Sequence, residues 1–515
     1  MVRWDGDDWL AGLVPSWGLN TTNSVGGKGF TTATGIDPFR RVGYLSPGAA
    51  PVSATTNSVI DAMQKNGVVY LTNAYTVGGT KLHEMAILTT TMTNAGAFPH
   101  TIALGGTHAA HTTLAASDII LYYIGATRYA FYSWNDNTDG DIGRYDLSAT
   151  FDDDWMSTVP ASGAVQSTTN PHPMIVGADD ILYIANGRFL NALDGQTGAN
   201  GTYYAARLTL PTDSIITSFA KTGDNLVIFA YKAAATSSGS YYKGECYAYF
   251  WDYTSEDPWK VVPIQGNYVN GGFSFNGTVG CFVQGANATI SGTKQSKLVL
   301  WNGSFFEPKV GFINNIPGHG GVEVYDNTIY WNSDGNIYQY GSPHFGLNSA
   351  LNRISLLGGT TSEGMLKNFS NDRMCGSAGT TTAGGMQRIN SGNYAGTCTT
   401  PTVNLPLQQS KQARIKSVKV YWFSQKSVGS NKITLTVYTD RATDSFKVID
   451  TTGNVGDDRQ TPPASLVNVW YDKYDATAFP TATALALNIT WTNVDSTITP
   501  AIPEAIEIYY EYENI

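Results

Sequence analysis

The chain has 515 residues, of which only 14% are charged, against roughly 25% in an ordinary soluble domain. Aromatic residues reach 12%, Gly occupies 54 positions, and Thr, Asn and Ser are abundant; this mixture of strand and turn formers excludes disorder, coiled coils and helical repeats. The net charge of −10, with Lys and Arg scattered, disfavours a surface that binds nucleic acid tightly. It allows a surface along which DNA moves without being bound. We therefore expect an all-β protein.

The N-terminal segment, residues 1–48, lacks the pattern of an export signal. Acidic residues follow Met1 where a secretory signal carries positive charge and then an apolar run, and no stretch approaches 18 consecutive apolar residues. We therefore expect a protein that folds in the cytoplasm and does not enter a membrane. The Gly-rich part, Gly18–Gly48, is expected to supply a strand that closes the repeat described next.

Short β-rich runs recur along the middle of the chain, each followed by a turn and a second run. Their starts lie 45 to 62 residues apart, which is close to the length of one four-stranded propeller blade and too long for leucine-rich or ankyrin repeats. The six runs are Val68–Leu71, Ile119–Ile124, Ile181–Ile184, Leu226–Phe229, Val279–Val283 and Thr328–Trp331.

Two of these units share a sequence motif as well as a spacing. Trp134-Asn135 and Trp331-Asn332 each lead through a short insert to Asp-Gly, then to Asp or Asn, Ile and, three residues later, Tyr. This motif is typical of a strand, a turn in which Gly supplies positive φ, and a returning strand. Unrelated hairpins with similar turns are the alternative interpretation.

Residues 49–400 are accordingly predicted to form a six-bladed β-propeller. Residues 344–400 are rich in Gly, Thr and Ser, which is typical of long loops, but Gly364–Phe369 could form a further strand. The sequence therefore leaves a seventh blade open.

From about Thr402 the pattern changes to longer strands in which apolar and polar residues alternate. Such a run of strands separated by turns predicts one β-sandwich over residues 401–515, of the immunoglobulin or jelly-roll kind. The predicted strands are Arg414–Phe423, Lys432–Asp440, Ser445–Thr451, Leu466–Lys473, Ala484–Asn493 and Glu504–Glu513.

The loop after Trp134 has the spacing of a calcium site. Its oxygen-bearing residues lie at alternate positions and at the twelfth position of an EF-hand-like loop, where they would converge on one ion. Asn replaces Asp at the first position and Asp replaces the bidentate Glu at the last, so a plain β-turn without a cofactor is favoured and Ca²⁺ is the alternative. The five candidate ligands are Asn135, Asn137, Asp139, Asp141 and Asp146.

No other pattern in the sequence predicts catalysis or metal binding. His108 and His111 lie three residues apart, but their surroundings favour strand or loop and no third ligand follows with metal-like spacing. The carboxylates of Asp152–Asp154 point to opposite faces if they lie on a strand, which suits a glycosidase poorly. The four cysteines show no CxxC spacing and are expected to be free thiols, or to form at most one pair late in the chain. We therefore expect no enzymatic activity.

Aromatic residues are frequent in the predicted sandwich, and planar rings can stack on the faces of sugars. Trp422 and Trp470 are the residues that a glycan site in the sandwich would use. Core packing is the alternative role for these side chains, and it explains most aromatic residues in such strands.

Three parts of the sequence resemble structural propeller proteins of tailed bacteriophages, and most closely the tail nozzle or tail-tube proteins of short-tailed phages. They are the stretch Phe39–Gly48, the blade phrase Ile181–Asp194 and the strand-rich C-terminal part. The resemblance implies a structural virion protein of the tail, made in the host cytoplasm, that forms a homo-oligomeric ring, with a hexamer favoured. DNA would pass through the lumen of this ring without specific binding, and portal, adaptor and tail fibre proteins would be its neighbours.

The C-terminal sandwich departs from this pattern and could be a display domain for host attachment. A host glycan-binding or receptor-binding tail protein is therefore the alternative function. A glycoside hydrolase is the least favoured function, because the sequence nominates no pair of carboxylates for it.

Overall fold

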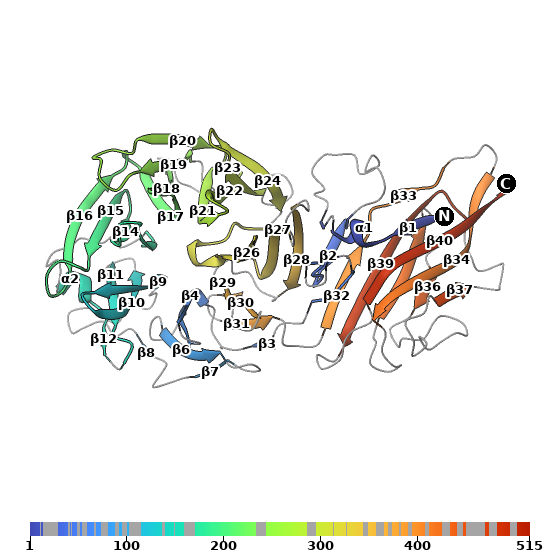
Figure 1. Ribbon diagram of the computed structural model, residues 1–515, viewed down its shortest axis with the longest axis horizontal. Coiled ribbons are helices and arrows are strands. Elements are labelled where there is room, and N and C mark those ends of the chain that lie inside the picture. Colours follow the sequence, from blue (N-terminus) through green and yellow to red (C-terminus); the bar gives the residue numbers. More distant parts are fainter. Residues whose placement is uncertain are drawn as a thin grey trace. The chain divides into compact units, whose positions relative to one another are not determined.

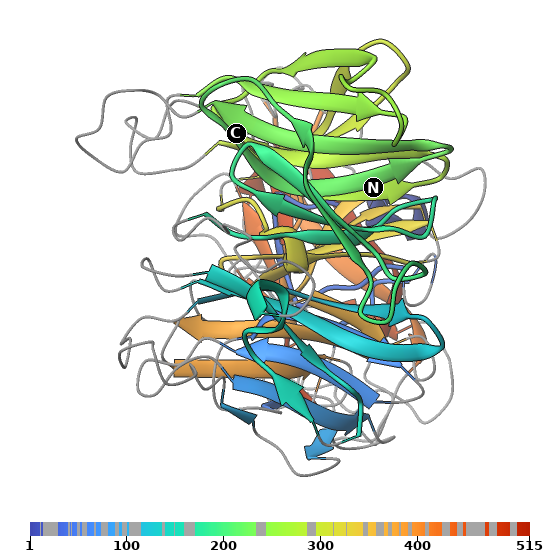
Figure 2. The same cartoon turned by 90° about the vertical axis from the view of Figure 1, so that its left-hand side faces the viewer.

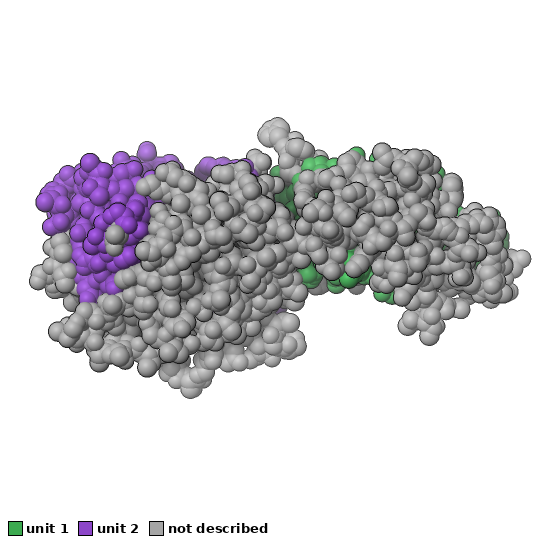
Figure 3. All heavy atoms as spheres, turned by 90° about the horizontal axis from the view of Figure 1, so that it is seen from below, with its two compact units in different colours: residues 1–52, 336–356, 389–515 green, residues 53–335, 357–388 purple. Residues whose placement is uncertain are grey.

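The computed structural model is all-β apart from short helices, as predicted, and its chain divides into two units (Figure 3). Unit 1 comprises residues 1–52, 336–356 and 389–515, and unit 2 comprises residues 53–335 and 357–388. The structure describes residues 1–10, 12–13, 29–39, 42, 44–48, 52–53, 59–65, 68–73, 81–87, 92–94, 100–101, 115–135, 140–148, 150–158, 170–232, 244–285, 295–312, 314–325, 327–342, 349–356, 365–368, 373–380, 383–389, 394–406, 411–424, 433–439, 446–449, 469–472, 481–494 and 502–514.

Seven antiparallel sheets, each with a path of four strands, form a propeller (Figure 1, and seen from the side in Figure 2). The first three sheets are β4 (Val59–Lys65), β5 (Val68–Asn73), β6 (Lys81–Ile87) and β7 (Met92–Asn94), with β8 (His100–Thr101) paired to β6; β9 (Ala115–Ile124), β10 (Thr127–Asn135), β11 (Gly140–Tyr145) and β12 (Phe151–Asp152); and β13 (Met174–Val176), β14 (Leu182–Asn186), β15 (Phe189–Asp194) and β16 (Thr202–Thr209). The helix α2 (Trp155–Thr158) follows β12.

The remaining four sheets continue the same order of strands. They are β17 (Ser214–Thr222), β18 (Asn225–Lys232), β19 (Cys246–Trp251) and β20 (Lys260–Ile264); β21 (Tyr268–Phe275), β22 (Thr278–Gln284), β23 (Ser296–Trp301) and β24 (Phe306–Phe312); β25 (Val322–Tyr325), β26 (Thr328–Ser333), β27 (Asn336–Gly341) and β28 (Ala350–Leu356); and β29 (Met365–Asn368), β30 (Arg373–Thr380), β31 (Ala383–Ile389) and β3 (Val52–Ser53).

The innermost strands of the seven sheets lie side by side in a closed ring. The order around the ring is β4, β9, β13, β17, β21, β25 and β29, after which β29 meets β4 again. Closure removes exposed edges at the centre of the propeller. The predicted propeller is therefore confirmed, and the seventh blade that the sequence left open is present.

The periodic runs in the sequence are mostly the second strand of each blade. Such a strand has a neighbouring strand on both sides and a packed face on both sides, so it reads as an apolar run instead of an alternating pattern. All five residues of β14 are buried, as are the central five of β18. The run at Ile119–Ile124 lies instead in the first strand of its blade, β9, which explains the longest spacing between two runs.

Tight turns with positive φ join the first and second strands of several blades. Asn276 and Gly277 (φ 49° and 76°) connect β21 to β22. Positive φ at both central residues of a two-residue turn matches the right-handed twist of a hairpin, and Asn-Gly is a favoured pair because neither residue resists this conformation strongly.

Unit 1 holds a β-sandwich made of two sheets. One sheet has the order β1-β40-β34-β37 with β38 paired to β34, and the other has the order β2-β32-β39-β35-β36 with β33 paired to β39. Their bounds are β1 (Val2–Trp4), β2 (Thr32–Thr34), β32 (Tyr394–Thr399), β33 (Val403–Asn404), β34 (Lys411–Ser424), β35 (Ile433–Thr439), β36 (Phe446–Ile449), β37 (Val469–Asp472), β38 (Thr481–Ala482), β39 (Ala484–Val494) and β40 (Ile502–Asn514).

The N-terminal segment contributes to this sandwich. Strand β1 pairs antiparallel with β40, β2 pairs with β32, and Trp9 of helix α1 (Gly6–Leu10) is fully buried in the same core as Ile506. The segment predicted to close the propeller, Gly18–Gly48, supplies β2 to the sandwich, whereas the strand that completes a blade is β3, just beyond that segment. The burial of large apolar side chains next to β40 gives the physical reason for this placement.

Candidate functional site

A single turn of 3-10 helix occupies the axis of the propeller. This helix, η2 (His319–Gly321), lies against β4, β17, β21, β26 and β29, which belong to five different blades. His319 reaches the other two blades, because its Nε2 lies 3.3 Å from Asp118 Oδ2 on β9 and 3.3 Å from the Met174 carbonyl oxygen on β13. The protein's own chain therefore fills the position where a propeller has its central channel.

The contacts of His319 favour its protonated form. Burial alone lowers the pKa of the imidazole, but the charge of Asp118, its hydrogen bond and the Met174 carbonyl outweigh burial, so that the pKa is raised. Asp118 is held in turn, since its Oδ1 accepts a hydrogen bond of 2.7 Å from the Ile119 backbone N–H. The ion pair with Asp118 thus fastens η2 to the second blade, and the hydrogen bond to the Met174 carbonyl oxygen fastens it to the third.

Glu323, which follows η2 in the chain, has a carboxyl group with a raised pKa. Glu323 lies on β25, opposite Tyr330 of β26. Burial raises the pKa of Glu323 to about 8, because a charged carboxylate loses its hydration among protein atoms. His319 on η2 and Glu323 on the innermost strand β25 thus both bind protons more readily than usual.

A second notable feature is an exposed apolar surface on the fourth and fifth blades. Trp259 is 57% exposed, Val261 48% and Phe305 54%. Trp259 directly precedes β20 and Phe305 directly precedes β24, so the two rings occupy equivalent positions in successive blades. We call Trp259, Val261 and Phe305, with Lys260, the aromatic surface. Adjacent residues of a strand point to opposite faces, so Val261 lies on the face of β20 opposite Lys260, and Phe305 on the face of β24 opposite Phe306.

The ring of Trp259 is held in place although it is exposed. Its Nε1–H donates a hydrogen bond of 2.7 Å to Asn225 Oδ1, and its ring packs against Phe250 with centroids 5.9 Å apart and planes 60° apart. A large side chain fixed in this way loses little conformational entropy on binding a ligand.

Lys260 connects the two halves of the aromatic surface. Its Nζ lies 4.5 Å from the centroid of Trp301 and 5.9 Å from that of Trp259, and it donates a hydrogen bond of 3.3 Å to the Gly303 carbonyl oxygen. A cation over aromatic faces is attracted to the negative charge of the rings. The start of β20 is therefore tied to the turn between β23 and β24.

That turn is itself rigid. Asn302 Oδ1 accepts hydrogen bonds of 3.0 Å from the backbone N–H groups of Ser304 and Phe305, and Gly303 takes a positive φ of 100°. A side-chain oxygen that caps its own turn fixes the direction of the residues that follow. Phe305 consequently points outwards while Phe306, 7% exposed, packs into the blade.

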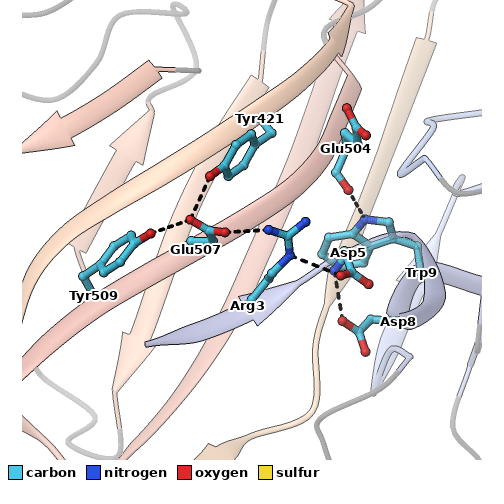
Figure 4. Close-up of polar contacts among 8 residues, drawn as sticks. All are labelled: Arg3, Asp5, Asp8, Trp9, Tyr421, Glu504, Glu507 and Tyr509. Atoms are coloured by element: carbon cyan, nitrogen blue, oxygen red, sulfur yellow. Dashed lines mark hydrogen bonds and ion pairs between the residues drawn. The ribbon is translucent and has the colours of Figure 1, made fainter. Parts of the chain in front are cut away.

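In unit 1, a polar network joins the two ends of the chain (Figure 4). Glu507 on β40 is 3% exposed and accepts hydrogen bonds from Arg3 Nη1 (2.6 Å), Tyr421 O–H (3.0 Å) and Tyr509 O–H (2.7 Å). Burial raises the pKa of Glu507, but the hydrogen bonds from Tyr509, Tyr421 and Arg3 outweigh it and lower the pKa overall. With its partners in place, Glu507 stabilises the pairing of β1 with β40 and has the role of a structural carboxylate.

The structure separates the described members of the proposed calcium set. Asn135 ends β10 and Asp141 lies at the start of β11, where Asn135 Nδ2 donates to the Asn170 carbonyl oxygen (3.1 Å) and Asp141 Oδ1 accepts from the Ile142 N–H (2.7 Å). Asp146 follows the far end of β11, where its Oδ1 caps a turn by accepting from Ser148 N–H (2.8 Å). An extended strand of this length holds its ends too far apart for one ion. Asn137 and Asp139 lie outside the described residues.

Other candidates from the sequence are only partly described. The side chains of Trp422 and Trp470 lie outside the described residues, although β34 and β37 include their backbones, and His108 and His111 lie outside them as well. Cys246, Cys281 and Cys398 are buried free thiols, as expected for these three. No group of three or more His, Cys, Asp or Glu side chains suited to a metal ion occurs within the described ranges. In the same part of the chain, no helix has the length and hydropathy to span a membrane.

The sequence contains a signal for the aromatic surface that its interpretation overlooked. Adjacent residues of a strand point to opposite faces, so the pair Phe305-Phe306 at the start of β24 must leave one ring on the outer side. Trp259 lies between Pro258 and Lys260, directly at the start of an outer strand. A large aromatic residue at that position in two successive blades predicts an exposed surface.

Comparisons with known proteins show no family for this chain. No protein-family model matches the chain, and no curated protein matches it by sequence. Among solved structures, the Dos1 propeller matches at 10% identity over 66% of this chain and 94% of that chain (TM-score 0.40). The Pan2 WD40 domain of Neurospora crassa matches at 9% identity over 65% and 88% (0.38), and Drosophila Semaphorin 1b, extracellular domains 1–2, at 8% over 66% and 87% (0.37).

The sheet order defines the class of the protein: a seven-bladed β-propeller joined to a β-sandwich. At these low identities and TM-scores, the solved structures carry no argument about activity or ligands.

Proposed function

We propose that this chain is a non-enzymatic structural protein of a phage tail, in which several copies form a ring around the DNA channel. The sequence phrases that resemble tail nozzle and tail-tube proteins favour this function. The low content of charged residues, with a net charge of −10, suits a wall past which phosphates slide without adhering.

The observation that carries the proposal is the filled axis of the propeller. Helix η2 lies against five blades and the contacts of His319 reach the other two, so the chain itself occupies the centre of the ring of blades. A duplex cannot pass through an axis that backbone and side chains occupy. The DNA channel of the proposed assembly therefore lies between copies of the chain, and each propeller is one segment of its wall.

This arrangement has consequences for partners and location. We place the protein in the tail of the virion, after synthesis in the host cytoplasm, as a homo-oligomeric ring for which a hexamer is favoured. Portal or adaptor proteins and tail fibres are its proposed neighbours, with no specific binding of DNA and no cofactor.

The test is the mass and shape of the assembled protein. The purified chain, alone and together with the portal-proximal proteins encoded beside it, is measured by native mass spectrometry and imaged by negative-stain electron microscopy. We expect closed rings with an open centre between propellers. A chain that stays strictly monomeric when those partners are present would overturn the proposal.

A further inference from the structure

We propose that Asn200, in the turn between β15 and β16, is a site of spontaneous deamidation, which converts its side chain to a carboxylate. The sequence contains six Asn-Gly pairs, and Gly offers the least steric resistance to a reaction at its backbone nitrogen because it has no Cβ. Since the turn belongs to one blade, the reaction does not depend on ring formation. Five of the pairs lie within the described residues and begin at Asn186, Asn200, Asn270, Asn276 and Asn302.

The reaction needs only the atoms of the Asn-Gly pair and water. The backbone nitrogen of Gly201 loses its proton to hydroxide and attacks Asn200 Cγ. An N–Cγ bond forms, the Cγ–Nδ2 bond breaks, and the amide nitrogen leaves as ammonia after it takes a proton from water. Water then opens the five-membered imide at either carbonyl and leaves aspartate or isoaspartate, without oxidation or reduction. Each conversion adds one negative charge to the formal net charge of −10.

Two conditions decide which pair reacts in the folded chain. The side-chain amide must turn its carbon towards the following backbone nitrogen, and the N–H of that nitrogen must be open to hydroxide. A hydrogen bond to either group slows the reaction, because breaking this bond adds to the barrier. The hydrogen bonds and burial of the five Asn-Gly pairs therefore rank their reactivity.

Asn200 meets both conditions. Its side chain is exposed and makes no hydrogen bond with any of the described residues, and the Gly201 N–H donates to none of them either. The tip of the turn is open, because a Cβ at Gly198 would meet no atom closer than 3.7 Å. The amide can therefore rotate towards the Gly201 nitrogen without losing a contact.

The turn is fixed at its base, below Asn200. Gln196 N–H donates a hydrogen bond of 2.9 Å to Asp194 Oδ1, and Thr197 O–H donates one of 2.8 Å to Thr202 Oγ1. These bonds hold the ends of β15 and β16 while the tip of the turn remains exposed. The reaction at Asn200 therefore requires no unfolding of the blade.

Hydrogen bonds hold the side chains of Asn302 and Asn276. Asn302 Oδ1 accepts hydrogen bonds of 3.0 Å from the N–H groups of Ser304 and Phe305. Asn276 Nδ2 donates to Asn327 Oδ1, and the positive φ of Asn276 (49°) is fixed by its hairpin turn. Rotation of either amide towards the following nitrogen breaks these contacts, so both pairs should react slowly.

Asn270 and Asn186 are protected in other ways. Asn270 Nδ2 donates 3.1 Å to the Tyr268 hydroxyl oxygen, and its Oδ1 accepts 2.8 Å from the Gly271 N–H, which keeps the proton on the attacking nitrogen. Asn186 is only 8% exposed at the end of β14, where hydroxide has little access. Among the described Asn-Gly pairs, that of Asn200 alone therefore has an exposed and unrestrained amide.

The conversion changes the connection between the two outer strands of the third blade. Isoaspartate places one additional carbon atom in the main chain, so the link from β15 to β16 becomes longer. Strand β16 begins two residues after Asn200 and pairs only with β15. We therefore expect faster hydrogen exchange at the start of β16 in the converted chain.

The experiment follows the five described pairs in the full chain during incubation at mildly alkaline pH. Tryptic digestion at mildly acidic pH and liquid chromatography with mass spectrometry then separate the Asn, Asp and isoaspartate forms of each peptide. Cleavage after Arg188 and Arg207 isolates Asn200 in a peptide without a second Asn-Gly pair. In the folded chain, Asn200 should convert at least about tenfold faster than each of the other four residues.

The matched controls are the unfolded chain and the variant Asn200→Gln. In guanidinium chloride, all five pairs should react within about threefold of one another, because each Asn is then followed by an unhindered Gly. Asn200→Gln keeps an amide but would have to form a six-membered imide, so the conversion in its peptide should disappear. Conversion of any of the other four residues as fast as Asn200 in the folded chain would overturn the proposal. Conversion of Asn200 only after unfolding, or an unchanged mass gain in the Asn200→Gln peptide, would overturn it as well.

Discussion

The propeller and the sandwich build their cores in opposite ways. In six of the seven blades, strands pair with neighbours in the sequence, as β14 pairs with β13 and β15, and the seventh blade alone takes a distant strand, β3. In the sandwich, β1 pairs with β40 from the other end of the chain, and Trp9 Nε1–H donates 3.0 Å to the Glu504 carbonyl oxygen across 495 residues. One chain therefore combines a unit built mainly from strand pairs that are close in the sequence with a unit that forms only when the two ends of the chain meet.

The two units also differ in the size of the side chains on which their packing depends. The propeller depends on close approach between neighbouring blades, where small residues let backbones meet. The sandwich depends on large side chains from the N-terminal segment, in which Trp9 stacks on Phe30 with centroids 6.1 Å apart and planes 6° apart. Substitutions in each unit should therefore act on that unit first.

Trp9→Ala should have the largest effect. The side chain is fully buried in the sandwich core, and its loss leaves a cavity and an unpaired carbonyl, at a cost of about 3–5 kcal/mol. Hydrogen exchange followed by mass spectrometry should show lost protection in β1, β34 and β40. Equal loss of protection in β14 and β18 of the propeller would contradict the comparison.

Gly195→Ala should destabilise the propeller. A Cβ at Gly195 would lie 2.0 Å from the Tyr123 carbonyl oxygen of the preceding blade, so the two backbones must separate, at a cost of about 2 kcal/mol. Urea unfolding with the same exchange readout measures this loss in β9, β14 and β15.

Gly285→Ala is the control for that substitution. Its Cβ would meet nothing closer than 3.5 Å, at the Gln295 carbonyl oxygen, and stability should change little. If the two alanine variants unfold at the same urea concentration, close approach between blades is not what limits the propeller.

The propeller should lose stability as pH rises, and Glu323→Gln should remove part of this loss. Burial raises the folded pKa of Glu323 to about 8, above its unfolded value of about 4.3, so folding binds a proton. The stabilisation is complete below the unfolded pKa and disappears as pH rises through the folded pKa. Between pH 5 and pH 9, the unfolding free energy of the wild type should fall relative to that of Glu323→Gln by about 4 kcal/mol. Parallel curves for the two proteins would show that Glu323 does not contribute.

The sandwich should show the opposite pH dependence, with a smaller effect. Hydrogen bonds from Tyr509, Tyr421 and Arg3 outweigh burial and lower the folded pKa of Glu507. Its stabilisation is therefore present above the unfolded pKa of about 4.3 and is lost as pH falls through the lowered folded pKa. The side chain of Arg3 is 46% exposed, which limits the cost of Glu507→Gln at pH 7 to about 1 kcal/mol. Urea titrations from pH 3 to pH 7 should bring the wild type and the variant together at the acidic end.

The blades were predictable because their signals are local. The buried second strands β14, β18, β22 and β26 appear as apolar runs, and turns such as Asn276-Gly277 mark the reversals between them. The seventh blade was left open because its second strand, Arg373–Thr380, contains Gly, Ser and Thr instead of an apolar run.

The candidate site was less predictable than the fold. The outward position of Trp259 depends on how β20 packs beside the turn at Asn302, and no periodicity in the sequence encodes that contact between blades. The axial position of His319 likewise depends on Asp118 and Met174, which lie in two other blades. For the proposed calcium site, the sequence spacing was regular but misleading. Strand β11 extends between Asp141 and Asp146 and separates their oxygen atoms.

The sequence by itself determined an all-β protein, a propeller repeat and a sandwich near the C-terminus, because alternation, apolar runs and turn residues act over a few neighbouring positions. Only the tertiary structure decided that the N-terminal strand joins the sandwich, that η2 fills the propeller axis and that Trp259 and Phe305 remain exposed. These outcomes depend on burial and pairing between residues far apart in the chain, where the area removed from water selects one partner among many that are locally equivalent.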